Sequence, residues 1–152
     1  MEVYRLCRKK FATVLSGKGA AIKGARWNSA GVEMIYTSLN RSLAMAEVAV
    51  HFSLATLPED YLMMSIFIPD NTSLQKLTVK DLPAGWNNFP APPSARMIGD
   101  EFIAANRYCV LQIPSAVTAG DYNLLINPGH AEFEKIKITG TEKFPFDKRI
   151  FK

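Results

Sequence analysis

Short apolar and β-branched runs, separated by turn-forming residues, recur along the 152-residue chain. This pattern predicts β-strands over residues 3–7, 33–37, 61–68, 108–113, 123–126 and 133–139, with a shorter and more polar run over 74–79. The run 61–68 is almost continuously apolar and stops before Pro69, which is typical of a buried strand.

Two segments predict longer helices. Residues 38–54 contain no glycine or proline and are rich in Leu, Ala and Met, so we expect a helix of about four turns. Ser38 or Asn40 would cap its start, and Pro58 would mark its end. Residues 94–106 predict a second helix with Gly99 as its weak point. One or two helical turns are expected over 9–15, and loops over 16–31 and 82–93.

Strands outnumber helices and are mostly not connected by crossover helices. The expected fold is therefore α+β, a single domain over residues 1–152 with a mixed or antiparallel sheet. The composition, 48% hydrophobic and 21% charged, excludes intrinsic disorder, collagen-like repeats and a coiled coil.

The formal net charge of +4 is unevenly distributed. Residues 1–26 hold seven basic residues against one acid, a net charge of +6, and the other 126 residues have a net charge of −2. Such a segment suits a phosphate-bearing small molecule, a nucleic acid or an acidic protein. A solvated surface with no partner is an equal alternative on charge alone.

The two cysteines, Cys7 and Cys109, lie in apolar runs and do not form a disulfide framework, so buried thiols in a reducing compartment are expected. The N-terminus lacks the apolar segment of a signal peptide. The most apolar stretch is interrupted by Glu47 and His51 and is too short to span a bilayer. A cytoplasmic protein without a membrane partner is expected.

Glu47 is the most informative single residue. On a helix its neighbours on the same face would be Leu43, Ala44, Val50 and His51, most of them apolar. Burying an ionised carboxylate is costly unless it is paired. Glu47 therefore either pairs with an arginine or faces a cleft and acts there.

Arg5 and Arg26 are candidate anion ligands. Arg5 interrupts an apolar strand, and Arg26 follows several glycines and precedes Trp27 and Asn28. Guanidinium groups bind pyrophosphate and carboxylate oxygens in pairs, and glycines let the backbone approach a ligand closely. The segment GKGAAIKGAR lacks the P-loop spacing, and G-x-G-x-x-G is absent. A surface arginine on a mobile loop is the alternative.

Three further polar positions lie near or after the ends of predicted strands. Tyr36 could stack on a flat cationic ring or fill the core. Ser115 follows a strand and Pro114, but without a G-x-S-x-G elbow a hydrolase-type nucleophile is not expected. Asn127, in a turn, suits a structural hydrogen bond.

Only two histidines, His51 and His130, are present. His51 follows Glu47 by four residues, which places both on one helix face, but two ligands are weak evidence for a metal. No metal site is expected.

Several short motifs, in this order and spacing, resemble the RES domain family. The resemblance runs from end to end of the chain. One departure is Ala25, where the family often has a second glycine. The motifs are VYRL at 3–6, GARWN at 24–28, IYTS at 35–38, LAMAE at 43–47, LPAGW at 82–86, IPSA at 113–116, NPGH at 127–130 and FDKR at 146–149.

The resemblance implies a fold similar to that of ADP-ribosyltransferases, with NAD bound in a cleft as substrate and no prosthetic group. It implies the toxin of a type II toxin–antitoxin system that consumes NAD by cleaving the nicotinamide–ribose bond, by hydrolysis or phosphorolysis. Carried over to this chain, the site residues are Arg5, Arg26, Tyr36, Glu47 and Ser115, with Asn127 a weaker candidate.

The implied roles suit the residue types. Glu47 would stabilise an oxocarbenium-like state or orient the nucleophile. Arg5 and Arg26 would hold the pyrophosphate, Tyr36 would stack on nicotinamide, and Ser115 would bind its amide or the adjoining ribose.

The resemblance also implies a partner, an Xre-like helix-turn-helix antitoxin that blocks the cleft. DNA would be contacted through the antitoxin and not directly, and a homodimer within the larger complex is compatible with the family. On this basis a small anionic ligand and a protein partner explain the charge of residues 1–26 better than DNA does.

Two other functions stay open. One is an ADP-ribosyltransferase that modifies a specific protein target, and the other is a non-enzymatic basic binding module. The sequence does not decide whether water, phosphate or a protein accepts the ADP-ribose.

Overall fold

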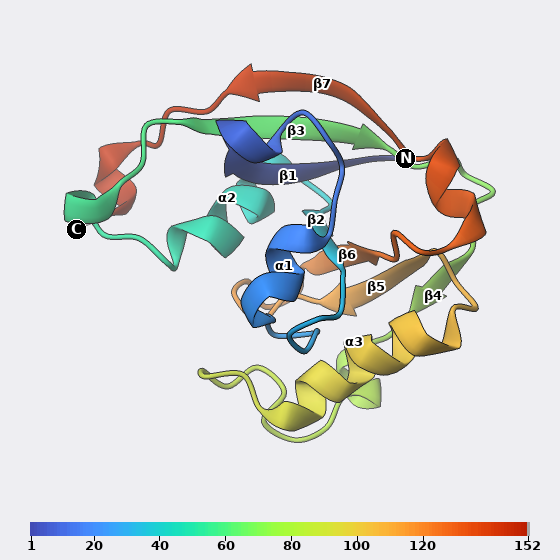
Figure 1. Ribbon diagram of the computed structural model, residues 1–152. Coiled ribbons are helices and arrows are strands. Elements are labelled where there is room, and N and C mark those ends of the chain that lie inside the picture. Colours follow the sequence, from blue (N-terminus) through green and yellow to red (C-terminus); the bar gives the residue numbers. More distant parts are fainter. Residues whose placement is uncertain (152) are drawn as a thin grey trace.

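The computed structural model describes residues 1–151, and within them one seven-stranded sheet forms the centre of the fold (Figure 1). The strand order is β4-β5-β6-β2-β1-β3-β7, and every neighbouring pair is antiparallel except the parallel pair β4–β5. The prediction of an α+β fold with a mixed sheet is confirmed. The strands are β1 (Glu2–Arg8), β2 (Ile35–Ser38), β3 (Tyr61–Phe67), β4 (Leu74–Lys76), β5 (Val110–Pro114), β6 (Tyr122–Ile126) and β7 (Lys137–Lys143).

The central pair of strands, β1 and β2, is joined at one register position only, Tyr4 opposite Ser38. By contrast, β1 pairs with β3 over its whole length, and β2 pairs with β6 over its four residues. Because β1 and β2 are not paired beyond Tyr4 and Ser38, their backbones next to this junction do not form a continuous ladder with each other. The candidate site lies at this junction.

Three α-helices accompany the sheet: α1 (Lys18–Lys23), α2 (Arg41–Ala49) and α3 (Pro93–Ala105). α1 lies within the segment predicted to be a loop, and its six residues end at Gly24, whose φ is +76°. Such a short helix leaves little periodicity to detect. The remaining helical pieces are the 3-10 turns η1 (Lys9–Phe11), η2 (Leu54–Thr56), η3 (Val79–Asp81), η4 (Ala131–Lys135) and η5 (Lys148–Ile150).

The predicted helix over residues 38–54 is shorter than expected, because α2 has nine residues. Ser38 belongs to β2, where it pairs with β6, and Asn40 is the N-cap, whose side chain accepts the Leu43 N–H at 2.8 Å. Pro58 does not end the helix. Instead Ser53 and Thr56 form a capping box that starts η2, so their side chains compete with a continued helix.

Similarly, the predicted strand over 133–139 begins later than expected, because η4 occupies residues up to Lys135 and β7 starts at Lys137. The His130 side chain caps η4 by accepting the N–H of Glu132 at 3.1 Å. A local cap of this kind favours a helical turn over an extended strand.

Gly99 does not weaken α3 but lets it pack closely. A Cβ atom at this position would lie 1.6 Å from the Trp27 carbonyl oxygen, so only glycine allows this approach. α3 thereby covers a buried cluster of aromatic and aliphatic side chains that includes Trp27, Trp86, Phe102 and Leu111. This packing anchors the segment that carries Arg26.

Both cysteines are buried free thiols, as expected. Within residues 1–151, no helix has the length and apolar character that crossing a membrane would require.

Candidate active site

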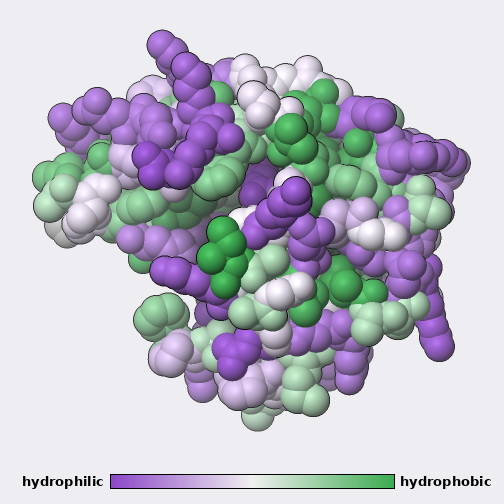
Figure 2. All heavy atoms as spheres, in the orientation of Figure 1, coloured by the Kyte–Doolittle hydropathy of each residue, from purple (hydrophilic) through white to green (hydrophobic). Residues whose placement is uncertain are grey.

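A cavity of about 1040 Å³ opens beside the β1–β2 junction. Its walls come from β1, β2, α2, residues 23–30 and the loop that carries Asn87 and Phe89. The volume is at the upper end of the roughly 300–1,000 Å³ usual for ligand pockets. The surface is hollowed at the left of Figure 2, above a protruding lower part of the molecule. A ligand as large as a dinucleotide can be accommodated here.

Glu47, on α2, lines this cavity and accepts two short hydrogen bonds. The Ser115 hydroxyl and the Asn123 side-chain amide each donate to Oε1 at 2.6 Å. Within residues 1–151 no arginine or lysine forms an ion pair with Glu47. Of the two alternatives that the sequence left open, the structure therefore favours a carboxylate held by neutral donors at the wall of a cleft.

Both donors to Glu47 are themselves oriented. The Ser115 oxygen accepts the N–H groups of Val117 (3.1 Å) and Thr118 (3.0 Å), which leaves its own proton for Glu47. The Asn123 carbonyl oxygen accepts a hydrogen bond from Ser38 at 2.8 Å, which directs the amide NH₂ group toward the carboxylate. The chain thus fixes the position of the Glu47 carboxylate from two strands and a turn.

Asn123 is a site residue that sequence reasoning missed. Ser38 and Asn123 are register partners on β2 and β6, and paired residues point to the same face of a sheet. Asn123 is a polar residue on an otherwise apolar strand, and it lies opposite the polar Ser38. This signal can be recognised only when the pairing of the two strands is known.

Arg5 lines the cavity from β1, and its guanidinium donates to the Ser16 carbonyl oxygen at 3.1 Å. Burial lowers the pKa of Arg5 from its ordinary value. An arginine nevertheless stays protonated at neutral pH. Arg5 is therefore a partly buried cation at the cavity wall without a carboxylate partner in the described chain.

Arg26 reaches the cavity from the segment after α1. One guanidinium nitrogen, Nη1, donates to the carbonyl oxygens of Trp86 (2.9 Å) and Asn88 (2.8 Å). Burial lowers the pKa of Arg26, and the negative charge of Glu47 acts in the opposite direction. Arg26 is therefore tied to the loop that contains Asn88, at the wall of the same cavity as Glu47.

Tyr36 lines the cavity from β2, with its hydroxyl group fully engaged. The hydroxyl donates to Asn28 Oδ1 at 2.6 Å and accepts the Trp27 N–H at 3.1 Å. Burial raises the pKa of Tyr36 well above its ordinary value, so the side chain is neutral. With its hydroxyl group held in this way, Tyr36 offers a ring of fixed orientation rather than an acid or base.

The lining of the cavity is strongly basic. Glu47 is its one carboxylate, against four arginine and lysine side chains. This balance attracts anions, and it explains where much of the positive charge of residues 1–26 is used. The four basic residues are Arg5, Lys23, Arg26 and Arg96.

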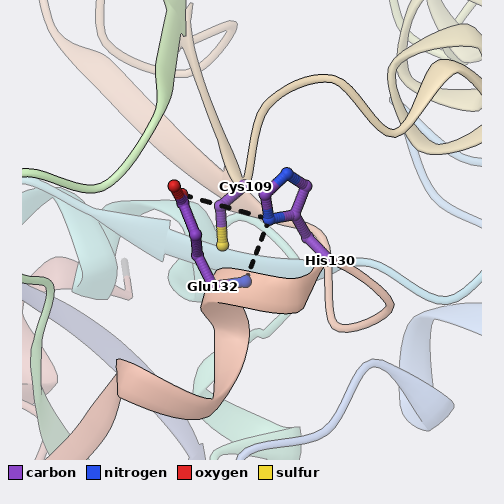
Figure 3. Close-up of side chains that lie close together, drawn as sticks. All are labelled: Cys109, His130 and Glu132. Atoms are coloured by element: carbon purple, nitrogen blue, oxygen red, sulfur yellow. Dashed lines mark hydrogen bonds and ion pairs between the residues drawn. The ribbon is translucent and has the colours of Figure 1, made fainter.

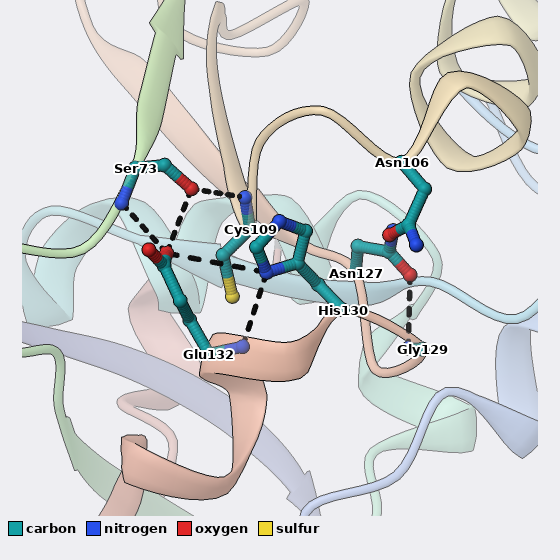
Figure 4. A network of polar contacts seen from close by, with 7 residues as sticks. All are labelled: Ser73, Asn106, Cys109, Asn127, Gly129, His130 and Glu132. Carbon is teal, nitrogen blue, oxygen red and sulfur yellow. Dashed lines mark hydrogen bonds and ion pairs between the residues drawn. The ribbon is translucent and has the colours of Figure 1, made fainter.

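Asn127 lies apart from the other predicted site residues. It follows the end of β6 opposite to Asn123, and it does not line the cavity. Its side chain accepts the Gly129 N–H and donates to Asn106 Oδ1, both at 2.9 Å (Figure 4). Of the site residues predicted from the sequence, the structure thus brings together Arg5, Arg26, Tyr36, Glu47 and Ser115. It does not bring Asn127 to them.

A second polar cluster includes Cys109, His130 and Glu132, whose potential metal ligand atoms lie within 4.8 Å of one another (Figure 3). Two of these atoms already accept hydrogen bonds. Glu132 Oε2 accepts the Ser73 N–H (2.8 Å) and hydroxyl (2.7 Å), and His130 Nδ1 accepts the N–H that caps η4. Burial, and secondarily Glu132, raises the pKa of Cys109 to about 11. These contacts describe a structural network that fixes β4 against η4 (Figure 4).

Comparison with known proteins gives one family. The model of the RES domain matches residues 2–147. A protein of Sphingobium sp. (strain YBL2) called Prs ADP-ribosylating toxin is 35% identical over 140 residues, which are 91% of this chain and 87% of that protein. A protein of Photorhabdus laumondii called Toxin Res is also 35% identical, over 155 residues that cover 100% of this chain and 98% of the relative.

Among solved structures, the fold is similar to a chain in the crystal structure of the M. tuberculosis MbcT–MbcA toxin–antitoxin complex. The TM-score is 0.74 with 18% sequence identity, and the match covers 94% of this chain and 83% of that one. At this identity the comparison concerns the fold.

Proposed function

The chain belongs to the RES domain family, and on this premise we propose that it is the toxin of a toxin–antitoxin pair. In this proposal the toxin binds NAD in its cavity and cleaves the nicotinamide–ribose bond. One observation carries the proposal. A carboxylate, Glu47, is held by two neutral donors at the wall of a large cavity whose lining also carries four arginine and lysine side chains and no other carboxylate. This combination suits a substrate with a negatively charged pyrophosphate and a reaction that develops positive charge.

Bond cleavage needs no general acid at this site. When the bond between the ribose C1′ and the nicotinamide nitrogen breaks, the electron pair goes to that nitrogen and neutralises its positive charge. The ribose then carries the positive charge of an oxocarbenium-like state. Glu47 supplies a fixed negative charge toward it, because Ser115 and Asn123 hold the carboxylate before the reaction.

An oxygen nucleophile completes the reaction by bonding to C1′ and losing its proton. Glu47 is the carboxylate in the cavity lining that can accept this proton. Arg5 and Arg26 would hold the pyrophosphate, and the fixed ring of Tyr36 would pack against nicotinamide. NAD enters as the substrate, and the proposal requires no prosthetic group or metal.

Water or phosphate as the nucleophile would make the protein an NAD-degrading enzyme. A second candidate is transfer of ADP-ribose to a protein, which is favoured by the relative named an ADP-ribosylating toxin. The proposed partner is a helix-turn-helix antitoxin that covers the cavity. A toxin–antitoxin complex among the similar structures supports such a partner.

The test is the release of nicotinamide from NAD by the purified protein, with and without phosphate. Glu47→Gln should lower kcat by at least about 100-fold, because the neutral amide removes the charge. Glu101→Gln, an exposed position on α3, is the matched control and should behave as the wild type. No release under either condition would refute NAD cleavage by water or phosphate, and label from adenine-labelled NAD on a lysate protein would select the transferase.

A further inference from the structure

Phe89 is the most exposed of the large apolar side chains in the described chain, at 87%, and it lines the cavity. An aromatic side chain in water forgoes the free energy that its burial would provide. Phe89 therefore has the features of a ligand contact, an aromatic surface presented to a basic cavity.

The loop that carries Phe89 is fixed at its base. Trp86 is buried and stacks on Trp27, with ring centroids 6.0 Å apart and an interplanar angle of 23°. Arg26 donates to the carbonyl oxygens of Trp86 and Asn88. The loop is thus held at Trp86 and at Asn88, immediately before Phe89.

The residues after Phe89 limit the loop further. Its sequence continues Pro90-Ala91-Pro92, and each proline ring fixes its own φ near −65°. The side chain of Phe89 is therefore exposed on a constrained loop rather than on a freely moving one.

Phe89 and Glu47 belong to different sides of the cavity. In Figure 1 the loop before α3 lies at the bottom left and α2 lies above it, with α1 drawn between them. Arg26 lines the same cavity as Glu47 and is hydrogen-bonded to the loop. Glu47, Arg26 and Phe89 all line this one cavity, so a single extended ligand can contact all three.

We propose that Phe89 stacks on the adenine ring of NAD, an assignment that rests on the function proposed above. In NAD the two flat rings are separated by two riboses and a pyrophosphate. With nicotinamide at Glu47 and the pyrophosphate near Arg26, the adenine reaches the loop. Stacking recognises the flat face of any base, so Phe89 provides affinity for the adenine end and leaves the reacting bond unaffected.

The experiment compares Phe89→Ala with the wild type on NAD and on nicotinamide mononucleotide, which has the same reacting bond but no adenine. The KM for NAD should rise roughly tenfold with kcat unchanged, and the KM for the mononucleotide should stay within about twofold. Binding of ADP-ribose, measured by calorimetry, should weaken by the same factor as the KM for NAD. Phe89→Tyr should restore both values, because the ring is retained.

Phe11→Ala is the matched control, because Phe11 is exposed but does not line the cavity. An unchanged KM for NAD, or equal losses on both substrates, would overturn the assignment. Normal kinetics combined with weakened antitoxin binding would assign Phe89 to the partner and overturn it too. If the wild type cleaves neither substrate, the proposed function fails, and unaltered ADP-ribose binding by Phe89→Ala would then reject the adenine contact separately.

Discussion

The side-chain amide of Asn123 donates a 2.6 Å hydrogen bond to Oε1 of Glu47, and Ser38 fixes the orientation of that amide. Asn123 touches the candidate catalytic carboxylate although it lies 76 residues further along the chain. The position of the Glu47 carboxylate therefore depends on a neutral donor from β6.

Replacing Asn123 by aspartate should change the pH dependence of nicotinamide release. Two carboxylates at this distance cannot both ionise readily, so the pair retains a proton and one pKa is strongly raised. Because the reaction needs ionised Glu47, activity should appear only at higher pH, and the pH–rate profile should move upward by about one unit or more.

Asn71→Asp is the control for that experiment, because it makes the same change at an exposed turn outside the cavity. Asn123→Ala removes the donor without adding a charge and should lower kcat, because the carboxylate loses a contact that positions it. A profile for Asn123→Asp that coincides with the wild type would contradict the role given to Asn123.

Replacing Arg26 by alanine should loosen the loop that carries Phe89. The variant loses two hydrogen bonds from a charged donor to the carbonyl oxygens of Trp86 and Asn88. Backbone amides over residues 85–92 should therefore exchange hydrogen faster, and the KM for NAD should rise about tenfold or more. Arg107→Ala, at an exposed position outside the cavity, should change neither quantity. Wild-type exchange rates in the Arg26 variant would show that other contacts hold the loop.

Replacing Gly99 by alanine should lower the free energy of unfolding by about 1–3 kcal/mol. The added Cβ would overlap the Trp27 carbonyl oxygen, so α3 has to move away from the segment that it supports. Chemical denaturation measures the loss. Gly19→Ala is the matched control in α1, where a Cβ atom meets no other atom within 4 Å, and it should stabilise the protein by up to about 1 kcal/mol. Equal stability of the two variants would exclude the close packing of α3.

The predicted bounds of the helices and strands were most accurate where buried positions recur at a regular spacing along the chain. The apolar run at 61–68 became β3 (Tyr61–Phe67), and the segment 94–106 became α3 (Pro93–Ala105). The predictions failed where local caps compete with periodicity. Ser53 and Thr56 start a new turn after α2, and the His130 cap turns the first part of the last predicted strand into η4.

By itself, the sequence determined the mixed α+β architecture, the basic segment, the membership of the family and five residues that meet at one site. Tertiary structure decided how they act. It placed Ser115 and Asn123 on Glu47 across 68 and 76 residues, used Arg26 to hold a loop 60 residues away, and separated Asn127 from the cavity. The physical reason is that local pattern records burial and turn preference. Hydrogen bonds between distant residues depend on strand register and on the single pairing of Tyr4 with Ser38, which opens the sheet at the cavity.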